Sequence, residues 1–220
     1  MKSIDAEKNK SAWNSLEKED SSEMETFIEE YKEFISKGKT EREASDHIEA
    51  EAKKNGFVDL YSEEEENFDA RGKYYAKNHG KSIIMINLGE ADLIDGVNIV
   101  GAHIDSPRLD LKQNPIYEDS DIVLLKTHYY GGIKKYQWTS LPLALHGIVY
   151  KSDGGKVSIS IGEDTQDPVF LISDLLPHLA KDQNAKKMSE AVTGESLNVI
   201  IGNMPCDQEK NPFKSRMLKI

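Results

Sequence analysis

The residues best suited to chemistry are His103 and Asp105, which are separated by one residue directly after an apolar run at residues 97–102. In an extended backbone, side chains two positions apart project to the same side, so the imidazole and the carboxylate can point into one site. Neutral imidazole is a common zinc ligand, and a nearby carboxylate can orient the ring or another ligand. The spacing alone fits both a metal site and a simple hydrogen-bonded pair, and both interpretations stay open at this point.

Residues 97–102 are expected to form the strand that carries this pair. Nearly every side chain of the run is apolar, which is typical of a central strand in a sheet covered on both faces. In open α/β sheets, functional sites gather at the carboxyl ends of the strands. His103 and Asp105 come after such an end, which favours a functional site there.

Two helices are expected near the start of the chain to support this strand. Apolar residues recur at spacings of three and four within residues 24–35, which predicts an amphipathic helix that ends before Gly38. Thr40 and Glu43 form a capping-box pattern, which predicts a second helix over residues 41–54. Methionine and aromatic side chains at this spacing are typical of a core, so no chemistry is assigned to them.

A β-hairpin is expected after the helices. Residues 73–77 and 82–87 have the composition of strands, and His79 and Gly80 between them suit a tight turn. Together with the helices and the apolar run, this hairpin predicts an α/β unit with a mixed sheet over residues 1–108.

The second half of the chain is predicted to be a separate β-rich domain at residues 109–220. Its sequence predicts strands at residues 122–125, 134–138, 141–150, 157–161 and 197–201. The Asp-Gly-Gly sequence within residues 152–155 is a strong hairpin signal. A short helix is expected at residues 172–181, and the start of another at residues 211–220.

The charge, the apolar runs and the cysteine count of the sequence argue against several classes of protein. The 220 residues carry a net charge of −11, and residues 1–66 hold 20 acidic against 10 basic side chains, which argues against nucleic-acid binding. No apolar run reaches the roughly 18–20 residues of a membrane span, and no secretory signal is recognised, so a cytoplasmic protein is expected. The single cysteine, Cys206, fits a reducing compartment and excludes a thiolate zinc cluster. Any metal must therefore use His, Asp and Glu.

The residues around the His-Asp pair resemble a known family. The sequence GAHIDSPR at residues 101–108 resembles the metal-binding motif of the M18 metalloaminopeptidases, the aspartyl-aminopeptidase-like enzymes. The similarity continues in KTHYYGG at residues 126–132, in LPLALHG at residues 141–147 and at residues 174–180. It covers roughly residues 20–215.

The resemblance implies a set of functional residues and an architecture. His103 would be a zinc ligand, Asp105 the catalytic aspartate that accompanies it, and His178 a residue that contacts substrate in the active site of a neighbouring subunit. The family binds two zinc ions in an α/β catalytic domain that is interrupted by an inserted dimerisation domain, and it assembles into dodecamers. The implied activity is removal of N-terminal residues, acidic ones by the family's name, from peptide substrates.

Two alternatives stand beside this prediction. The family's remaining ligands and its general base lie beyond the inserted domain, so the chain is expected to be truncated before it reaches them. It would then be an inactive fragment that acts only through oligomer contacts. The second alternative is an M42-type peptidase with two zinc ions, which shares the His-x-Asp arrangement. The KTHYYGG sequence and the Ser-Pro that comes after Asp105 favour M18.

Overall fold

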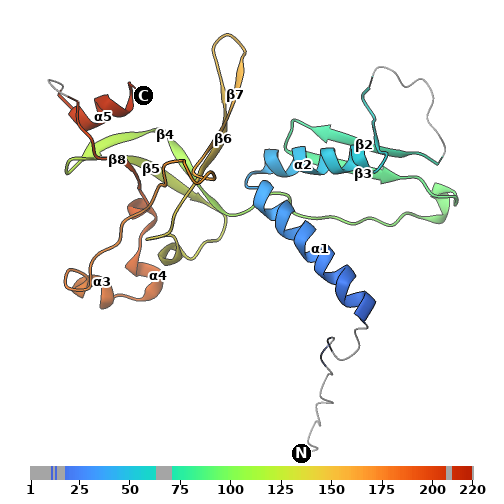
Figure 1. Ribbon diagram of the computed structural model, residues 1–220, viewed down its shortest axis with the longest axis horizontal. Helices are drawn as coiled ribbons and strands as arrows, with labels where there is room; N and C mark the ends of the chain where they lie inside the picture. Colours follow the sequence, from blue (N-terminus) through green and yellow to red (C-terminus); the bar gives the residue numbers. More distant parts are fainter. Residues whose placement is uncertain (1–10, 12, 14–17, 63–70, 207–209, 220) are drawn as a thin grey trace, which may run out of the picture. The chain divides into compact units, whose positions relative to one another are not determined.

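The computed structural model describes residues 11, 13, 18–62, 71–206 and 210–219 (Figure 1). The chain separates into two compact units, with the division between Asp105 and Ser106. Among the described residues, the first unit contains one sheet and the second contains two.

Two helices begin the first unit, as the sequence predicts. Helix α1 spans Lys18–Lys37 and α2 spans Glu41–Lys54. The capping box of α2 is present: the Glu43 N–H donates to Thr40 Oγ1 at 3.3 Å, and the Thr40 N–H donates to Glu43 Oε2 at 2.9 Å. These two bonds satisfy backbone donors that a helix N-terminus leaves open.

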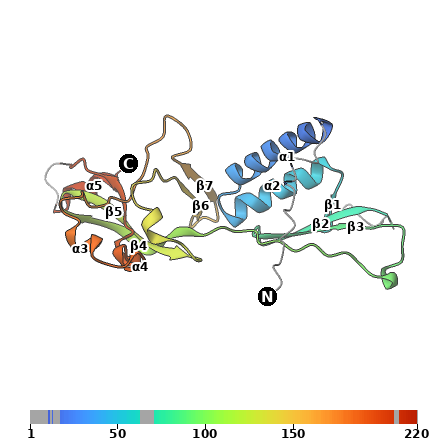
Figure 2. The same ribbon diagram turned by 90° about the horizontal axis from the view of Figure 1, so that it is seen from below.

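A three-stranded sheet completes the first unit. Strand β1 spans Val58–Asp59 and runs parallel to β2 (Lys73–Asn78), which pairs antiparallel with β3 (Ser82–Asn87). The predicted hairpin is confirmed, with positive φ at His79 (50°) and Gly80 (66°), the backbone that a two-residue turn needs. Helices α1 and α2 form a layer on one face of this sheet (Figure 2).

A cluster of charged side chains links α2 to strand β2 of the sheet. Lys77 Nζ on β2 donates to Glu49 Oε2 at 2.8 Å and also bonds Asp46, while Lys53 Nζ lies 2.6 Å from Glu49 Oε1. The Tyr75 hydroxyl donates to the same carboxylate at 3.3 Å. Hydrogen bonds from Lys53 and Lys77 lower the pKa of Glu49 to about 2.

The strand expected at residues 97–102 is not formed. The sheet order is β1-β2-β3, and residues 97–102 come after the short 3₁₀ turn Leu93–Asp95 as irregular chain. Within the described part of the chain, no segment pairs with them. The prediction of a central strand is therefore wrong for this chain as described, because a central strand requires a neighbour on each edge.

The second unit contains two antiparallel sheets. Strands β4 (Arg108–Asp119), β5 (Ile122–Tyr130) and β8 (Val199–Gly202) form one in the order β4-β5-β8. Strands β6 (Leu145–Tyr150) and β7 (Lys156–Ile161) form the other, a hairpin closed at the predicted Asp-Gly-Gly turn, where Gly154 has φ 85°. The β4–β5 register shifts between Leu111 and Ile116, where residues 112–115 stand opposite Lys126 alone.

Several predictions for the second unit are wrong. Residues 134–138 contain the 3₁₀ turn Lys135–Gln137 instead of a strand, and β4 was not predicted as a strand. Residues 172–180 of the predicted helix at 172–181 are not helical, because Leu171 forms a β-bridge with Ile200 and the Ser140 N–H donates to the Ile172 carbonyl at 2.8 Å. The remaining helices are α3 (Lys181–Asn184), α4 (Met188–Ala191) and α5 (Pro212–Met217), with a 3₁₀ turn at Gly194–Ser196. Only α5 was expected.

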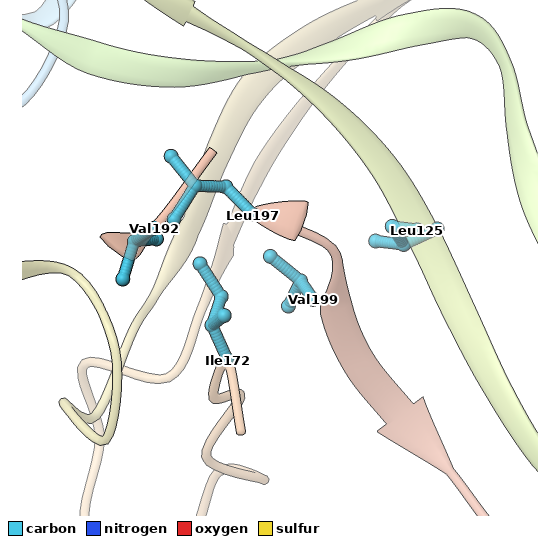
Figure 3. Packing of buried hydrophobic residues seen from close by; sticks show 5 residues of the cluster. All are labelled: Leu125, Ile172, Val192, Leu197 and Val199. Carbon is cyan, nitrogen blue, oxygen red and sulfur yellow. The ribbon is translucent and has the colours of Figure 1, made fainter. Parts of the chain in front are cut away.

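The core of the second unit joins segments far apart in the sequence. Figure 3 shows Leu125 of β5, Ile172, Val192, Leu197 and Val199 of β8 packed together. Ile172 and Leu197 are almost completely buried, and the buried Thr127 hydroxyl donates to the Leu197 carbonyl. Burial of these residues holds the irregular segments on the sheet.

The cluster around Glu49 predicts a pH-dependent stability. Because the pKa of Glu49 lies at about 2 in the fold against an ordinary 4.5, its contribution is complete above pH 4.5 and is lost as the pH falls through about 2. The side chain is 22% exposed, so we expect a contribution of about 1–2 kcal/mol to the free energy of unfolding. Denaturant unfolding between pH 2 and pH 6 measures it.

Glu49→Gln should remove this part of the pH dependence. The matched control is Glu29→Gln, because Glu29 is a helix carboxylate whose pair with Lys32 is exposed on both sides. Equal pH profiles for the two variants would contradict the prediction.

Candidate functional site

The structure brings the two main site candidates together. His103 Nδ1 lies 2.9 Å from Asp105 Oδ1 and 2.9 Å from the Asp105 main-chain oxygen. The imidazole is 78% exposed, whereas the carboxylate is only 15% exposed. The pair lies in irregular chain and not at the end of a sheet strand, but the expected proximity of the two side chains is present.

This contact decides which imidazole nitrogen could bind a ligand. In the neutral ring, an N–H at Nδ1 can donate to Asp105 Oδ1 and to the Asp105 main-chain oxygen. The lone pair of Nε2 is then available for a metal. Zinc-binding histidines commonly donate their other ring nitrogen to a carboxylate or a carbonyl in this way. The geometry therefore suits His103 as a metal ligand and Asp105 as the group that orients it.

The pair alone would not be enough to hold a catalytic zinc ion. A catalytic zinc takes about three protein ligands and keeps one open position. Across residues 18–62, 71–206 and 210–219, no three His, Cys, Asp or Glu side chains gather in a way that could hold a metal. The donor types fit zinc, but the described residues do not complete its coordination.

His178 belongs to the second unit, on an exposed turn. The predicted helix is absent there: the Leu179 N–H donates to the Leu176 carbonyl at 2.9 Å, and the Ala180 N–H to the Pro177 carbonyl at 3.3 Å. His178 is exposed between these two bonds, and Leu176 and Leu179 beside it are exposed as well. The turn thus presents an imidazole flanked by apolar side chains to the solvent.

Asp174 fixes the start of this turn. Its carboxylate accepts from Gln183 Nε2 at 2.9 Å, from the Leu175 N–H at 2.8 Å and from the Thr139 hydroxyl at 3.2 Å. The hydrogen bond from Gln183, followed by that from the Leu175 N–H, lowers the pKa of Asp174. The ionised carboxylate therefore ties both flanks of the turn to the rest of the second unit.

The first residue of β4 connects the end of the GAHIDSPR sequence to the KTHYYGG sequence. The Arg108 guanidinium lies 4.3 Å from the centre of the Tyr130 ring, and its Nε donates to Asp110 Oδ1 at 2.8 Å. Gly131 lies beside Pro107 and has a φ of 78°, a left-handed backbone that glycine adopts without strain. Both segments carry the family resemblance, but the sequence alone indicates no individual role for Arg108, Asp110 or Tyr130.

A second histidine–carboxylate pair lies in the β6–β7 hairpin region. His146 Nε2 is 3.0 Å from Glu163 Oε1, and the His146 side chain is only 12% exposed. His128 stacks on Tyr129 with ring centres 5.7 Å apart. From the sequence, both histidines are interpreted as packing or hydrogen-bonded residues. The contact with Glu163 fits this interpretation for His146, whereas His128 is exposed.

Comparison with known protein families shows that the chain matches zinc metallopeptidases. Residues 34–219 match the family described as "Aminopeptidase I zinc metalloprotease (M18)". A probable M18 family aminopeptidase 1 of Clostridium acetobutylicum is 46% identical over an alignment of 220 positions, and the match covers 96% of this chain and 46% of the relative. The chain belongs to the M18 family, which sets the M42 alternative aside.

Solved structures give the same result. The crystal structure of the M18 aminopeptidase of Thermotoga maritima is 47% identical with a TM-score of 0.86, and the match covers 94% of this chain and 44% of that one. Aminopeptidase I of Borrelia burgdorferi has a TM-score of 0.80 at 39% identity, over 94% of this chain and 46% of that one. This chain therefore spans less than half the length of these relatives.

A more distant structure shares the fold. A dodecamer of mApe1 from S. cerevisiae matches with a TM-score of 0.61 at 21% identity, over 81% of this chain and 39% of that one.

Among the described helices, none is both long enough and apolar enough to cross a membrane.

The contact between His103 and Asp105 predicts a particular tautomer. In the neutral ring the proton should sit on Nδ1, where Asp105 Oδ1 and the Asp105 main-chain oxygen can both accept the hydrogen bond. Long-range ¹H–¹⁵N spectra of the metal-free chain measure the tautomer. Asp105→Ala should shift the His103 signals toward the Nε2–H form, whereas Asp110→Ala should leave them unchanged. An Nε2–H ring in the unmodified chain would contradict the structure.

Proposed function

We propose that this chain supplies one part of a zinc aminopeptidase that removes N-terminal residues from peptides. The observation that carries the proposal is the His103–Asp105 contact within a chain that belongs to the M18 zinc metalloproteases. The same proposal includes a preference for acidic N-terminal residues, which the family's name implies. It also includes a cytoplasmic location, because a single cysteine fits a reducing compartment.

Each residue of the pair has a distinct role in this proposal. His103 binds zinc through Nε2, and Asp105 holds the ring in position through Nδ1. Asp105 is the catalytic aspartate of the family pattern, and its Oδ1 lies 2.9 Å from Nδ1 of the ring. Zinc, when bound, polarises the scissile carbonyl and makes a bound water a stronger nucleophile.

The rest of the metal site is proposed to come from outside this chain. A site for two zinc ions needs a bridging carboxylate and further ligands, and the described residues provide no cluster of three. The relatives are more than twice as long as the segment that matches this chain. We assign the missing ligands and the general base to the part of an M18 chain that has no counterpart here.

The second unit is proposed to be the inserted dimerisation domain. It is β-rich and has its own core, as a separately folding insertion requires. The exposed turn with His178 would reach the active site of a neighbouring subunit and contact the substrate. The dodecameric assembly of the S. cerevisiae structure supports self-association of this fold.

A non-catalytic role is the second candidate. The absence of a three-ligand cluster among the described residues favours it, because one imidazole and one carboxylate do not hold a catalytic metal. In that case the chain would act only through contacts with other subunits.

Zinc content and peptidase activity distinguish the two candidates. The chain is purified alone and after co-expression with the part of the Thermotoga maritima aminopeptidase that it does not cover. Each preparation is dialysed, analysed for zinc and assayed on chromogenic substrates with acidic or neutral N-terminal residues. We expect about two zinc ions per chain and turnover only in the co-expressed complex, because only that complex holds a full ligand set.

Variants assign the activity to the proposed site. His103→Ala should lose zinc and activity in the complex, whereas His128→Ala, an exposed histidine that stacks on Tyr129, should keep both. An inactive and zinc-free complex that is nevertheless assembled would support the non-catalytic role. Full zinc and turnover in the chain alone would contradict the assignment of the missing ligands.

Mixing two inactive complexes tests the role of His178. If His178 acts in a neighbouring subunit, a mixed oligomer of the His103→Ala and His178→Ala forms contains some sites with both histidines intact. Reassembly of the two variants should therefore restore part of the activity, which each variant lacks by itself. A mixture as inactive as its components, with mixed oligomers verified by native mass spectrometry, would contradict the proposal.

A further inference from the structure

The turn that carries His178 is an exposed stretch of chain between two buried residues. Ile172, which belongs to the core cluster of Figure 3, is 1% exposed, and Ala180 is 4% exposed. All the residues between them, 173–179, are exposed. The core therefore holds the two ends of this stretch and leaves its middle to other contacts.

Burial of side chains contributes little to holding the middle of the turn. Leu175, Leu176 and Leu179 are 53%, 60% and 66% exposed, so they lose little apolar surface to the rest of the second unit. The backbone bonds from Leu179 to Leu176 and from Ala180 to Pro177 join residues of the turn itself. They shape the turn locally, but they do not fix its direction on the unit.

The Asp174 carboxylate makes the contacts that fix this direction. Its Oδ1 accepts from Gln183 Nε2 of α3, which comes after the turn, at 2.9 Å. Its Oδ2 accepts from the hydroxyl of Thr139, which lies 35 residues earlier in the chain, at 3.2 Å. Oδ1 also accepts the Leu175 N–H at 2.8 Å, which orients the backbone where the turn begins. Hydrogen bonds to an ionised carboxylate are stronger than bonds between neutral groups.

We propose that Asp174 is a positioning residue for His178. Its bonds to Gln183 and Thr139 hold the turn in the orientation from which the imidazole contacts the substrate. The inference rests on the function proposed above, in which His178 acts at the active site of a neighbouring subunit. Asp174 acts on that reaction only through the placement of His178, and a misplacement of about 1 Å can lower a rate about 100-fold.

Two substitutions separate the hydrogen bonds of Asp174 from its charge. Asp174→Ala removes the carboxylate and every bond that it accepts. Asp174→Asn keeps an oxygen for Gln183, and its amide N–H can donate to Thr139 Oγ1. The Thr139 hydroxyl can then donate to the Tyr136 carbonyl, which lies 3.2 Å away. Asp182→Ala is the matched control, because Asp182 is an exposed carboxylate on α3 beside Gln183.

Nuclear magnetic relaxation of the full chain measures the anchoring without any assay of activity. Backbone order parameters at residues 175–179, Pro177 apart, should be about 0.85 in the unmodified chain and below about 0.6 in Asp174→Ala. Asp174→Asn and Asp182→Ala should keep the values of the unmodified chain. Thermal unfolding should be the same in all four proteins, because both aspartates are exposed.

Kinetics show whether Asp174 acts through His178. They are measured in the complex co-expressed with the uncovered part of the Thermotoga maritima aminopeptidase. Asp174→Ala should lower kcat/KM about 10- to 100-fold, with the loss divided between kcat and KM as it is in His178→Ala. The double variant should be no slower than His178→Ala, because Asp174 has no effect once the imidazole is gone. Asp174→Asn should stay within about threefold of the unmodified complex, because it keeps the hydrogen bonds.

Other results would overturn the inference. Rigid residues 175–179 in Asp174→Ala would show that other contacts hold the turn. A double variant whose loss is the product of the two single losses would show that Asp174 acts independently of His178. An equal loss in Asp174→Asn and Asp174→Ala would assign the effect to charge and not to the hydrogen bonds. A mobile turn in Asp174→Ala, together with an unmodified complex that has no turnover, would sustain the positioning of His178 and instead refute the proposed aminopeptidase function.

Discussion

A β-strand forms only where a neighbouring strand pairs with its backbone N–H and C=O groups, and this requirement decides which segments of the described chain are strands. Strands β2 and β3 pair with each other and receive α2 on one face, where Lys77 links the sheet to Glu49. Residues 97–102 have the composition of a strand but no partner among the described residues, and they stay irregular. The contact between His103 and Asp105 directly after them is local and forms without the sheet. Among the described residues, the contact between His103 and Asp105 is thus present without a sheet around it.

Local signals in the sequence predicted much of the fold. The Thr40–Glu43 capping box, the His79–Gly80 turn and the Asp-Gly-Gly turn each depend on a few adjacent residues, and the structure confirms all three. Predictions failed where distant segments decide the conformation. Residues 172–181 have a helical pattern, but the β-bridge between Leu171 and Ile200 holds their start extended, and Pro177 interrupts the remainder of the segment.

In the candidate site too, contacts between near neighbours in the sequence were predictable, and contacts between distant segments were not. The proximity of His103 and Asp105 was predictable, because two residues separated by one position have few ways to move apart. The contacts of Asp174 with Gln183 and Thr139 could not be predicted, since they require the fold of the second unit. The family pattern supplied a role for His178, whereas its place on an exposed turn is known only from the structure.

The irregular middle of β4 limits how the second unit can meet other molecules. This strand lies at the edge of its sheet, where an uninterrupted backbone would offer a template for another chain. Residues 112–115 stand opposite Lys126 alone, and Pro115 among them has no N–H to donate. A continuous sheet cannot therefore extend across the middle of β4 into a neighbour. The two regular stretches of β4, residues 108–111 and 116–119, therefore cannot act together as one long template for another strand.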